Sequence, residues 1–253
     1  MVFEIEKDLE LVLAGARAAG DAALAKSCEL TATPDSPGGW KVEIAVETEG
    51  EAFAKIDRMV NDSDVPLARA RQLRLYLAWK GHVESQFQEG YNFHFGRNIQ
   101  QDYVIARYWY EKAAVSGHAA AQNNLGVLLS DGLGGKVDNA KAVYWYMKSA
   151  EGGDRVAKGN LGEHFFDGAG VRKSYLKAAQ LLKEYLKTSP YNAKTHRLLA
   201  ECYEHGVGGR HGLRLAMHHY QEASDFGSHK ARAALRRLGA RAYRRDVRCQ
   251  KPQ

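Results

Sequence analysis

Histidine is the side chain best suited to metal binding or proton transfer near neutral pH. The histidines of this chain are concentrated in its C-terminal part. Six of the ten histidines fall between residues 196 and 229: His196, His205, His211, His218, His219 and His229. His218 and His219 are adjacent, so on a helix their side chains diverge by about 100° and do not converge on one ion. No carboxylate or cysteine joins them at ligand spacing. The pattern therefore predicts no metal site and no cofactor.

A second candidate for chemistry is the glycine-rich loop G-L-G-G-K at residues 132–136, which invites comparison with a phosphate-binding loop. It lacks the Ser or Thr that should follow the lysine, and its spacing is wrong. The same loop recurs in altered form along the chain, which favours a structural turn. Neither a GxSxG nor an HExxH motif occurs elsewhere. We therefore expect a non-enzymatic protein.

The basic charge of the chain is concentrated at its end. Residues 230–253 hold nine Lys or Arg against a single acid, Asp246, which gives +8, whereas the whole chain carries +6. One interpretation is a contact for nucleic acid, an anionic membrane or an acidic partner. The other is a solvated cap, because stacking aromatic residues do not accompany the charges. The candidate basic patch comprises Arg236, Arg237, Arg241, Arg244 and Arg245.

The cysteines and the chain start bear on the compartment. Cys28, Cys202 and Cys249 are odd in number, widely spaced and free of any CxxC pair, which is typical of free thiols in a reducing compartment. The acidic N-terminus lacks the pattern of a secretory signal, and no stretch approaches the roughly 20 apolar residues of a membrane span. We expect a cytoplasmic protein.

These residues must be positioned by an internal repeat, which residues 119–154 carry most clearly. Their fixed points are Gly126, Gly132, Asp138, the run Tyr144-Trp145-Tyr146 and Gly153. A shift of 36 residues in either direction, and a further shift of 38, recovers much of the pattern. Self-similarity at such a period indicates a repeat array. The predicted units are 83–118, 119–154, 155–190 and 191–228.

Each unit is predicted to be a hairpin of two helices. Residues 119–130 carry apolar residues at helical spacing, and the glycines after them break that helix. Asp138 stands where an N-cap acceptor belongs, and residues 140–150 form the second helix before Gly153. Gly126 and Ala142 are expected to mark close helix contacts. Aromatic side chains such as Trp145 need stacked neighbours to be buried.

Residues 119–153 resemble the Sel-one-like repeat family, a relative of the tetratricopeptide repeats. They follow its pattern A-x-x-x-L-G, then G-V-x-x-D-x-x-K-A-x-x-W-Y-x-K, and residues 83–117 match it from Gly96 onward. The later units carry Leu181 and His219 in place of the tryptophan. The resemblance implies an all-α fold, a right-handed α-solenoid of αα-hairpins that serves as a protein-interaction scaffold. In bacteria, proteins that look like this act as signalling adaptors, host-interaction factors or inhibitors of secreted toxins.

Helical caps are expected on both sides of the array. Residues 1–46 read as an N-terminal helical cap and loop, within which 41–49 fits either a strand or a helix. Residues 47–82 read as a degenerate αα repeat or an unrelated capping hairpin. Residues 229–253 form a basic capping helix and tail.

The resemblance places partner binding on the concave face, which the first helices line. A protein or peptide is the expected partner, and no small-molecule substrate is expected. Phe87 and Tyr91 are natural anchors if exposed, although they could instead pack against the preceding hairpin. The full candidate set is Phe87, Tyr91, Asn123, Val127, Glu163, Arg197 and Glu201.

Overall fold

The computed structural model describes residues 54, 58 and 67–249, with side chains described at 54, 58 and 71–239. The predicted N-terminal cap at 1–46, the strand-or-helix segment at 41–49 and the first half of the predicted degenerate repeat at 47–82 lie outside these residues.

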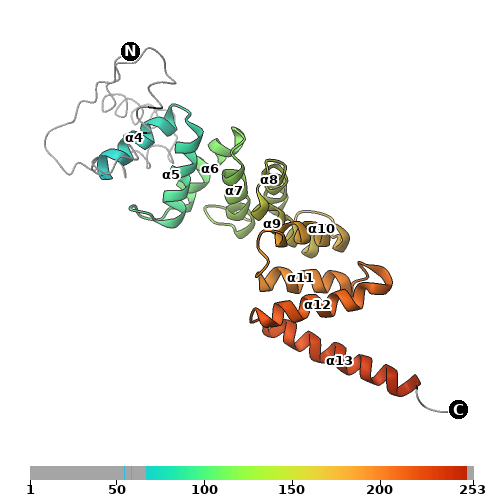
Figure 1. Ribbon diagram of the computed structural model, residues 1–253. Helices are drawn as coiled ribbons and strands as arrows, with labels where there is room; N and C mark the ends of the chain where they lie inside the picture. The colour runs from blue at the N-terminus through green and yellow to red at the C-terminus, as the bar shows by residue number, and fades with distance from the viewer. Residues whose placement is uncertain (1–53, 55–57, 59–66, 250–253) are drawn as a thin grey trace. The chain divides into compact units, whose positions relative to one another are not determined.

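Helices account for all the regular structure in the described part of the chain, which confirms the all-α fold class (Figure 1). Each predicted unit from residue 83 onward contains two helices joined by a short loop. Among the elements with described bounds, one helix precedes these units and one follows them. The elements are α4 (Leu67–Trp79), α5 (Val83–Phe95), α6 (Tyr103–Val115), α7 (Ala119–Asp131), α8 (Asn139–Glu151), α9 (Arg155–Asp167), α10 (Tyr175–Leu186), α11 (Ala193–Glu204), the 3₁₀ turn η1 (Gly209–His211), α12 (Gly212–Asp225) and α13 (His229–Cys249).

Side-chain caps set the start of the second helix in three successive hairpins. Asp102, Asp138 and Ser174 follow one another at 36-residue intervals. Each accepts a hydrogen bond from a backbone N–H two or three residues further on. Such a cap satisfies an N–H that has no partner inside the helix. The predicted role of Asp138 is therefore confirmed, and it recurs in the neighbouring hairpins.

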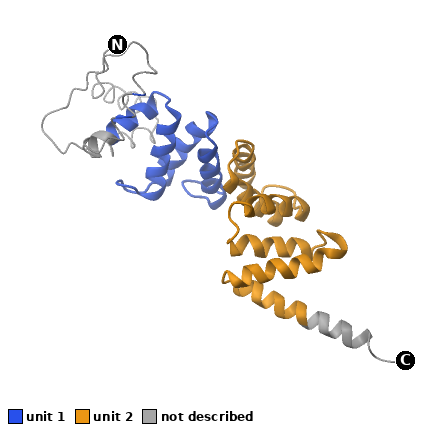
Figure 2. Cartoon of the chain, in the orientation of Figure 1, with its two compact units in different colours: residues 1–137 blue, residues 138–253 orange. Residues whose placement is uncertain are grey.

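The described chain forms two compact units, residues 1–137 (unit 1) and 138–253 (unit 2) (Figure 2). In unit 1, α5 packs against α4 and α6, α6 packs against α7, and α5 also touches α7. In unit 2 the helices from α8 to α13 contact one another in chain order, and α9 also touches α11. The first helices of successive hairpins are thus neighbours within each unit. We call the surface that they share the first-helix face.

Glycines permit the closest approaches between helices inside these hairpins. A Cβ on Gly90 would lie 2.6 Å from the Tyr110 ring, and one on Gly162 would lie 2.9 Å from Leu182. Both glycines stand one repeat away from Gly126 in the sequence. The expectation that this position marks close helix packing therefore holds in the hairpins on either side.

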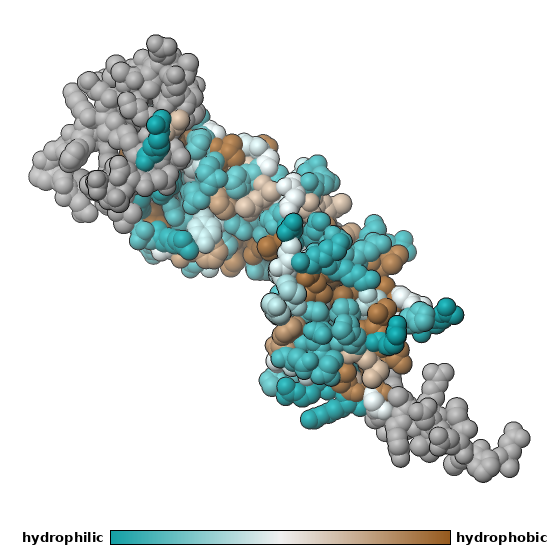
Figure 3. Space-filling model, in the orientation of Figure 1, coloured by the Kyte–Doolittle hydropathy of each residue, from teal (hydrophilic) through white to brown (hydrophobic). Residues whose placement is uncertain are grey.

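The core of units 1 and 2 is built from aromatic and aliphatic residues of their helices. Trp109, Tyr110 and Tyr220 are almost fully buried. Hydrophobic and hydrophilic residues are interspersed on the surface of both units in the view of Figure 3. No helix in the described part of the chain is both long enough and apolar enough to cross a membrane.

Candidate functional site

The seven residues predicted to bind a partner all lie on first helices and divide between the two units. The unit 1 group lies on α5 and α7, and the unit 2 group lies on α9 and α11. The groups are Phe87, Tyr91, Asn123 and Val127 in unit 1, and Glu163, Arg197 and Glu201 in unit 2.

In unit 1, α5 carries a row of three aromatic rings at intervals of one turn. The ring centroids of Phe87 and Tyr91 are 6.0 Å apart, and those of Tyr91 and Phe95 are 4.5 Å apart. Phe87 and Tyr91 are half-buried, whereas Phe95 is 52% exposed. Because residues four apart share one helix face, the row is a continuous surface. We call Phe87, Tyr91 and Phe95 the aromatic row.

The N-terminal end of the aromatic row is held by α6 and α7. The Phe87 ring lies 6.0 Å from the Tyr110 ring and stacks on His118 at 4.5 Å. His118 Nδ1 accepts from the Ala121 N–H at 3.2 Å. His118 Nε2 therefore carries the proton and donates to the Glu84 carboxylate at 3.1 Å. Phe87 thus packs toward the following helices, which fixes the base of the row.

The middle of the row carries a cation. The Arg97 guanidinium lies 4.7 Å from the centre of the Tyr91 ring. A guanidinium over an aromatic face contributes about 0.5–1 kcal/mol at an exposed site. The contact holds Tyr91 and places a positive charge beside an apolar surface.

The other two predicted residues of unit 1 lie on α7 and differ in burial. Asn123 is buried, with 7% exposure, and donates to Asn124 Oδ1 at 3.4 Å. Val127 is half-buried. The aromatic row is therefore the large accessible surface of α5, whereas the Asn123 side chain lies in the interior.

In unit 2, the predicted charged residues lie among ion pairs. Lys194 of α11 bonds Glu163 of α9 at 2.6 Å, and Arg197 pairs with Glu201 along α11. Exposed ion pairs stabilise a fold by about 0–1 kcal/mol each. Their chief effect here is that each predicted charged residue is already paired with a side chain of the same unit.

The predicted basic patch is partly engaged in the same way. Arg237 of α13 bonds Glu204 of α11 at 2.6 Å, and the Tyr220 hydroxyl donates to the same carboxylate at 2.5 Å. Burial together with the Glu204 carboxylate raises the pKa of Tyr220. Arg236 is exposed. Arg241, Arg244 and Arg245 lie on α13, but their side chains fall outside the described set.

Two further titratable groups with shifted pKa values lie in the core. Burial raises the pKa of the Glu89 carboxyl to about 7 and that of the Cys202 thiol to about 12. Both side chains are buried, so they are withheld from a substrate. Across the described residues, no three His, Cys, Asp or Glu side chains come together as a metal site. His196 and His219 do meet, with their Nδ1 atoms 3.0 Å apart.

Three comparisons relate the chain to known proteins. The family model described as the Sel1 repeat matches residues 83–118, 119–154, 156–184 and 193–227. A solved structure of c5321, a protective antigen of uropathogenic Escherichia coli with an SLR fold, is 27% identical with a TM-score of 0.61. The match covers 74% of this chain but only 40% of that chain.

A Sel1 repeat protein from Oxalobacter formigenes is similar over a larger share of both chains. It is 26% identical with a TM-score of 0.57, over 90% of this chain and 86% of that chain. No curated protein matches the sequence. The structural neighbours are therefore proteins built from the same type of repeat.

Proposed function

Since the chain belongs to the Sel1 repeat family, whose members generally act as protein–protein interaction scaffolds, we propose that this protein binds a protein partner through the aromatic row of unit 1. The observation that carries the proposal is the continuous row from Phe87 to Phe95, which is held at one end and exposed at the other. Packed helices present such a row in one fixed arrangement. A preformed surface lowers the ordering cost of binding.

The chemistry of the row indicates the kind of partner. Aromatic side chains contribute large contact area at low conformational cost and are enriched among the residues that dominate interface energies. Arg97 adds a cation beside Tyr91. We therefore propose a partner segment with an apolar or aromatic anchor and a nearby acidic residue. The roles that we propose for such a protein are a bacterial signalling adaptor, a host-interaction factor or a toxin-inhibiting protein.

The cytoplasm is the compartment that we propose. Its support is Cys202, which is buried as a free thiol. A reducing compartment keeps such thiols unpaired.

Phe95→Ala tests the proposed surface. We expect this substitution to weaken partner binding by at least 2 kcal/mol, about 30-fold, because it removes an exposed aromatic anchor. The measurement is affinity capture from the native cell by the full-length chain, quantified by mass spectrometry. A protein enriched by the unchanged chain should be lost with the variant. Isothermal titration with the purified partner then gives the affinity ratio.

Tyr144→Ala is the matched control, because Tyr144 is also 52% exposed but lies on the second helix α8. It should retain the partner. The proposal is wrong if Phe95→Ala retains every protein that the unchanged chain captures. It is equally wrong if the two variants lose the same partner to the same extent.

The alternative function, binding of nucleic acid or an anionic membrane through α13, stays a prediction. Arg237 is already bonded to Glu204, so one of its five arginines is committed to the fold. The described residues contain no feature that favours this alternative over the aromatic row.

A further inference from the structure

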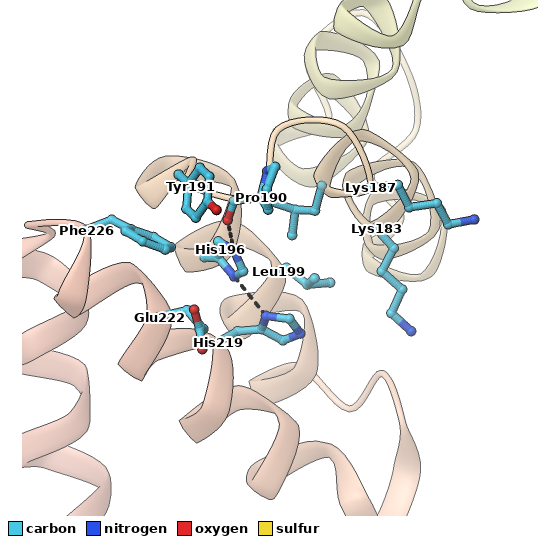
Figure 4. A pocket seen from close by; sticks show the side chains of 10 residues that line it. Lys183, Lys187, Pro190, Tyr191, His196, Leu199, His219, Glu222 and Phe226 are labelled. Carbon is cyan, nitrogen blue, oxygen red and sulfur yellow. Dashed lines mark hydrogen bonds between the residues drawn. The ribbon is translucent and has the colours of Figure 1, made fainter.

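Unit 2 contains a cavity of about 390 Å³ that opens to solvent between α10, α11 and α12 (Figure 4). Its size falls in the range of small-molecule sites in proteins, about 300–1,000 Å³. Two histidines, His196 and His219, lie at its centre. The aromatic row belongs to unit 1, so this cavity is a separate site.

The repeat alignment explains why a cavity forms in this hairpin. His219 stands at the position that Trp109 and Trp145 occupy in the first two repeats, 83–118 and 119–154. A tryptophan is much bulkier than a histidine, so its replacement leaves space beside α11. The fourth repeat (191–228) thus differs from the first two repeats at a residue that lines the cavity.

His196 is the second replacement. The corresponding residues, Gln86 and Gln122, donate from Nε2 to the carbonyls of Ala78 and Ala114, each at 3.0 Å. In the fourth repeat, His196 Nε2 makes the comparable bond to the Pro190 carbonyl at 2.8 Å. The ring leaves its second nitrogen, Nδ1, available for a side chain on α12.

The hydrogen bonds assign both histidine tautomers. The Pro190 carbonyl oxygen only accepts, so His196 Nε2 carries a proton and the neutral ring has a lone pair on Nδ1. His219 Nδ1 lies 3.0 Å from that Nδ1 and must donate to it. His219 Nε2 is then an acceptor, and no residue with a described side chain bonds it. Burial, with the neighbouring His196, lowers the pKa of His219 to about 4, so the ring is neutral at pH 7.

Opposite charges stand on the two sides of His219. Glu222 lies one turn along α12, whereas Lys183 and Lys187 come from α10 on the other side (Figure 4). Lys187 bonds Glu184 at 2.5 Å, whereas Lys183 Nζ makes no ion pair among the described residues and lies 5.3 Å from the centre of the Tyr203 ring. One side of the cavity thus suits a donor or cation, and the other suits an anion.

The remaining wall is apolar. Tyr191, which is 78% exposed, meets Phe226 edge to face with ring centroids 5.5 Å apart. Both rings line the cavity near Pro190. An apolar or aromatic body of a ligand would find contact area there.

We propose that this cavity binds a small zwitterion with an apolar body, the chemistry that amino acids and dipeptides share. The ligand ammonium pairs with the Glu222 carboxylate, on the opposite side of the His219 ring from its Nε2, which faces α10 (Figure 4). Its carboxylate meets Lys183, and its apolar body packs on Tyr191 and Phe226. This inference goes beyond the scaffold function and does not depend on it.

Isothermal titration of the full chain at pH 7 tests the proposal, with L-phenylalanine and L-phenylalanyl-L-leucine as probes. For a ligand of about a dozen non-hydrogen atoms we expect a Kd of about 10⁻⁴ M. The tighter of the two probes identifies a free amino acid or a dipeptide as the preferred source. N-acetyl-L-phenylalanine and L-phenylalaninamide each lack one charge and should bind about 10-fold more weakly.

Variants of the cavity connect that binding to the named groups. Glu222→Gln and Lys183→Gln should each weaken binding by about 10-fold. His219→Trp restores the tryptophan of the first two repeats. It should fill the cavity and abolish binding. Lys177→Gln, on α10 but away from the cavity, is the matched control and should bind as the unchanged chain does.

The proposal is overturned if neither zwitterion binds at about 10 mM, a hundred times the expected Kd. It is also overturned if the acetylated or amidated probe binds as tightly as L-phenylalanine. Far-UV circular dichroism checks that His219→Trp is folded. If that variant unfolds, equal affinities of Glu222→Gln, Lys183→Gln and the unchanged chain still contradict the assignment.

Discussion

Gly134→Ala and Gly170→Ala should each lower the free energy of unfolding by about 4 kcal/mol. Both glycines have left-handed backbone angles, with φ of 72° and 70°. A Cβ on Gly134 would press into the backbone carbonyl of Tyr103, and one on Gly170 into that of Asn139. Each carbonyl belongs to the first residue of the preceding hairpin's second helix, so the backbone itself must move.

Gly153→Ala separates the cost of the clash from the cost of the backbone angle. Gly153 has a φ of 89°, but a Cβ there would meet nothing within 4 Å. This control should lose only about 1–2 kcal/mol, the cost of a left-handed conformation for a residue with a Cβ. Urea unfolding followed by circular dichroism gives all three values. Equal losses for the three variants would mean that the loop glycines do not hold neighbouring hairpins together.

Trp109→Ala should be comparably damaging. Trp109 is 2% exposed, and removal of a buried tryptophan side chain costs about 3–5 kcal/mol through lost burial and the cavity that remains. Trp145 occupies the same position one repeat later. Each indole meets the tyrosine before it in the sequence, Tyr108 or Tyr144, edge to face with ring centroids 5.0 Å apart. Trp145 is only half-buried, however. Trp145→Ala should therefore cost about half as much.

The same urea experiment compares the two tryptophan variants. Measuring both in one series matters because Trp109 and Trp145 have the same residue type and the same position in the repeat. The ordering, with Trp109→Ala the more destabilised, follows from burial alone. A larger loss for Trp145→Ala would contradict the packing described for α6.

Much of the fold follows from local features of the sequence. The predicted helix at 119–130 is observed at Ala119–Asp131, and the one at 140–150 at Asn139–Glu151. These limits are predictable because a capping side chain or a left-handed glycine ends each helix within a few residues. The repeat then carries the same limits to other hairpins.

Contacts between side chains were less accessible from the sequence than the limits of the helices. Phe95 was missed as a member of the aromatic row, although its spacing of four from Tyr91 is a signal that places both on one helix face. His219 was judged against its neighbour His218, yet it bonds His196, 23 residues away. That pairing depends on how α11 and α12 pack. The repeat comparison marked His219 as a replacement for tryptophan, and the same comparison at position 196 would have marked His196 as a replacement for Gln86 and Gln122.

The charged candidates show the same limit. The repeat placed Glu163, Arg197 and Glu201 on first helices, as observed. It did not reveal that Lys194 would bond Glu163 from the next first helix. Ion pairs between hairpins depend on side-chain reach across α9 and α11, which residue spacing along one helix does not determine.

Hydrogen–deuterium exchange of the full chain with its captured partner tests the central claim most directly, because it locates the binding surface without a substitution. We predict slower amide exchange in α5 (Val83–Phe95) and at the start of α7 near His118, with α10 and α12 unchanged. Slowing confined to the helices of unit 2, with α5 exchanging as in the free chain, would contradict the assignment of the aromatic row as the binding surface.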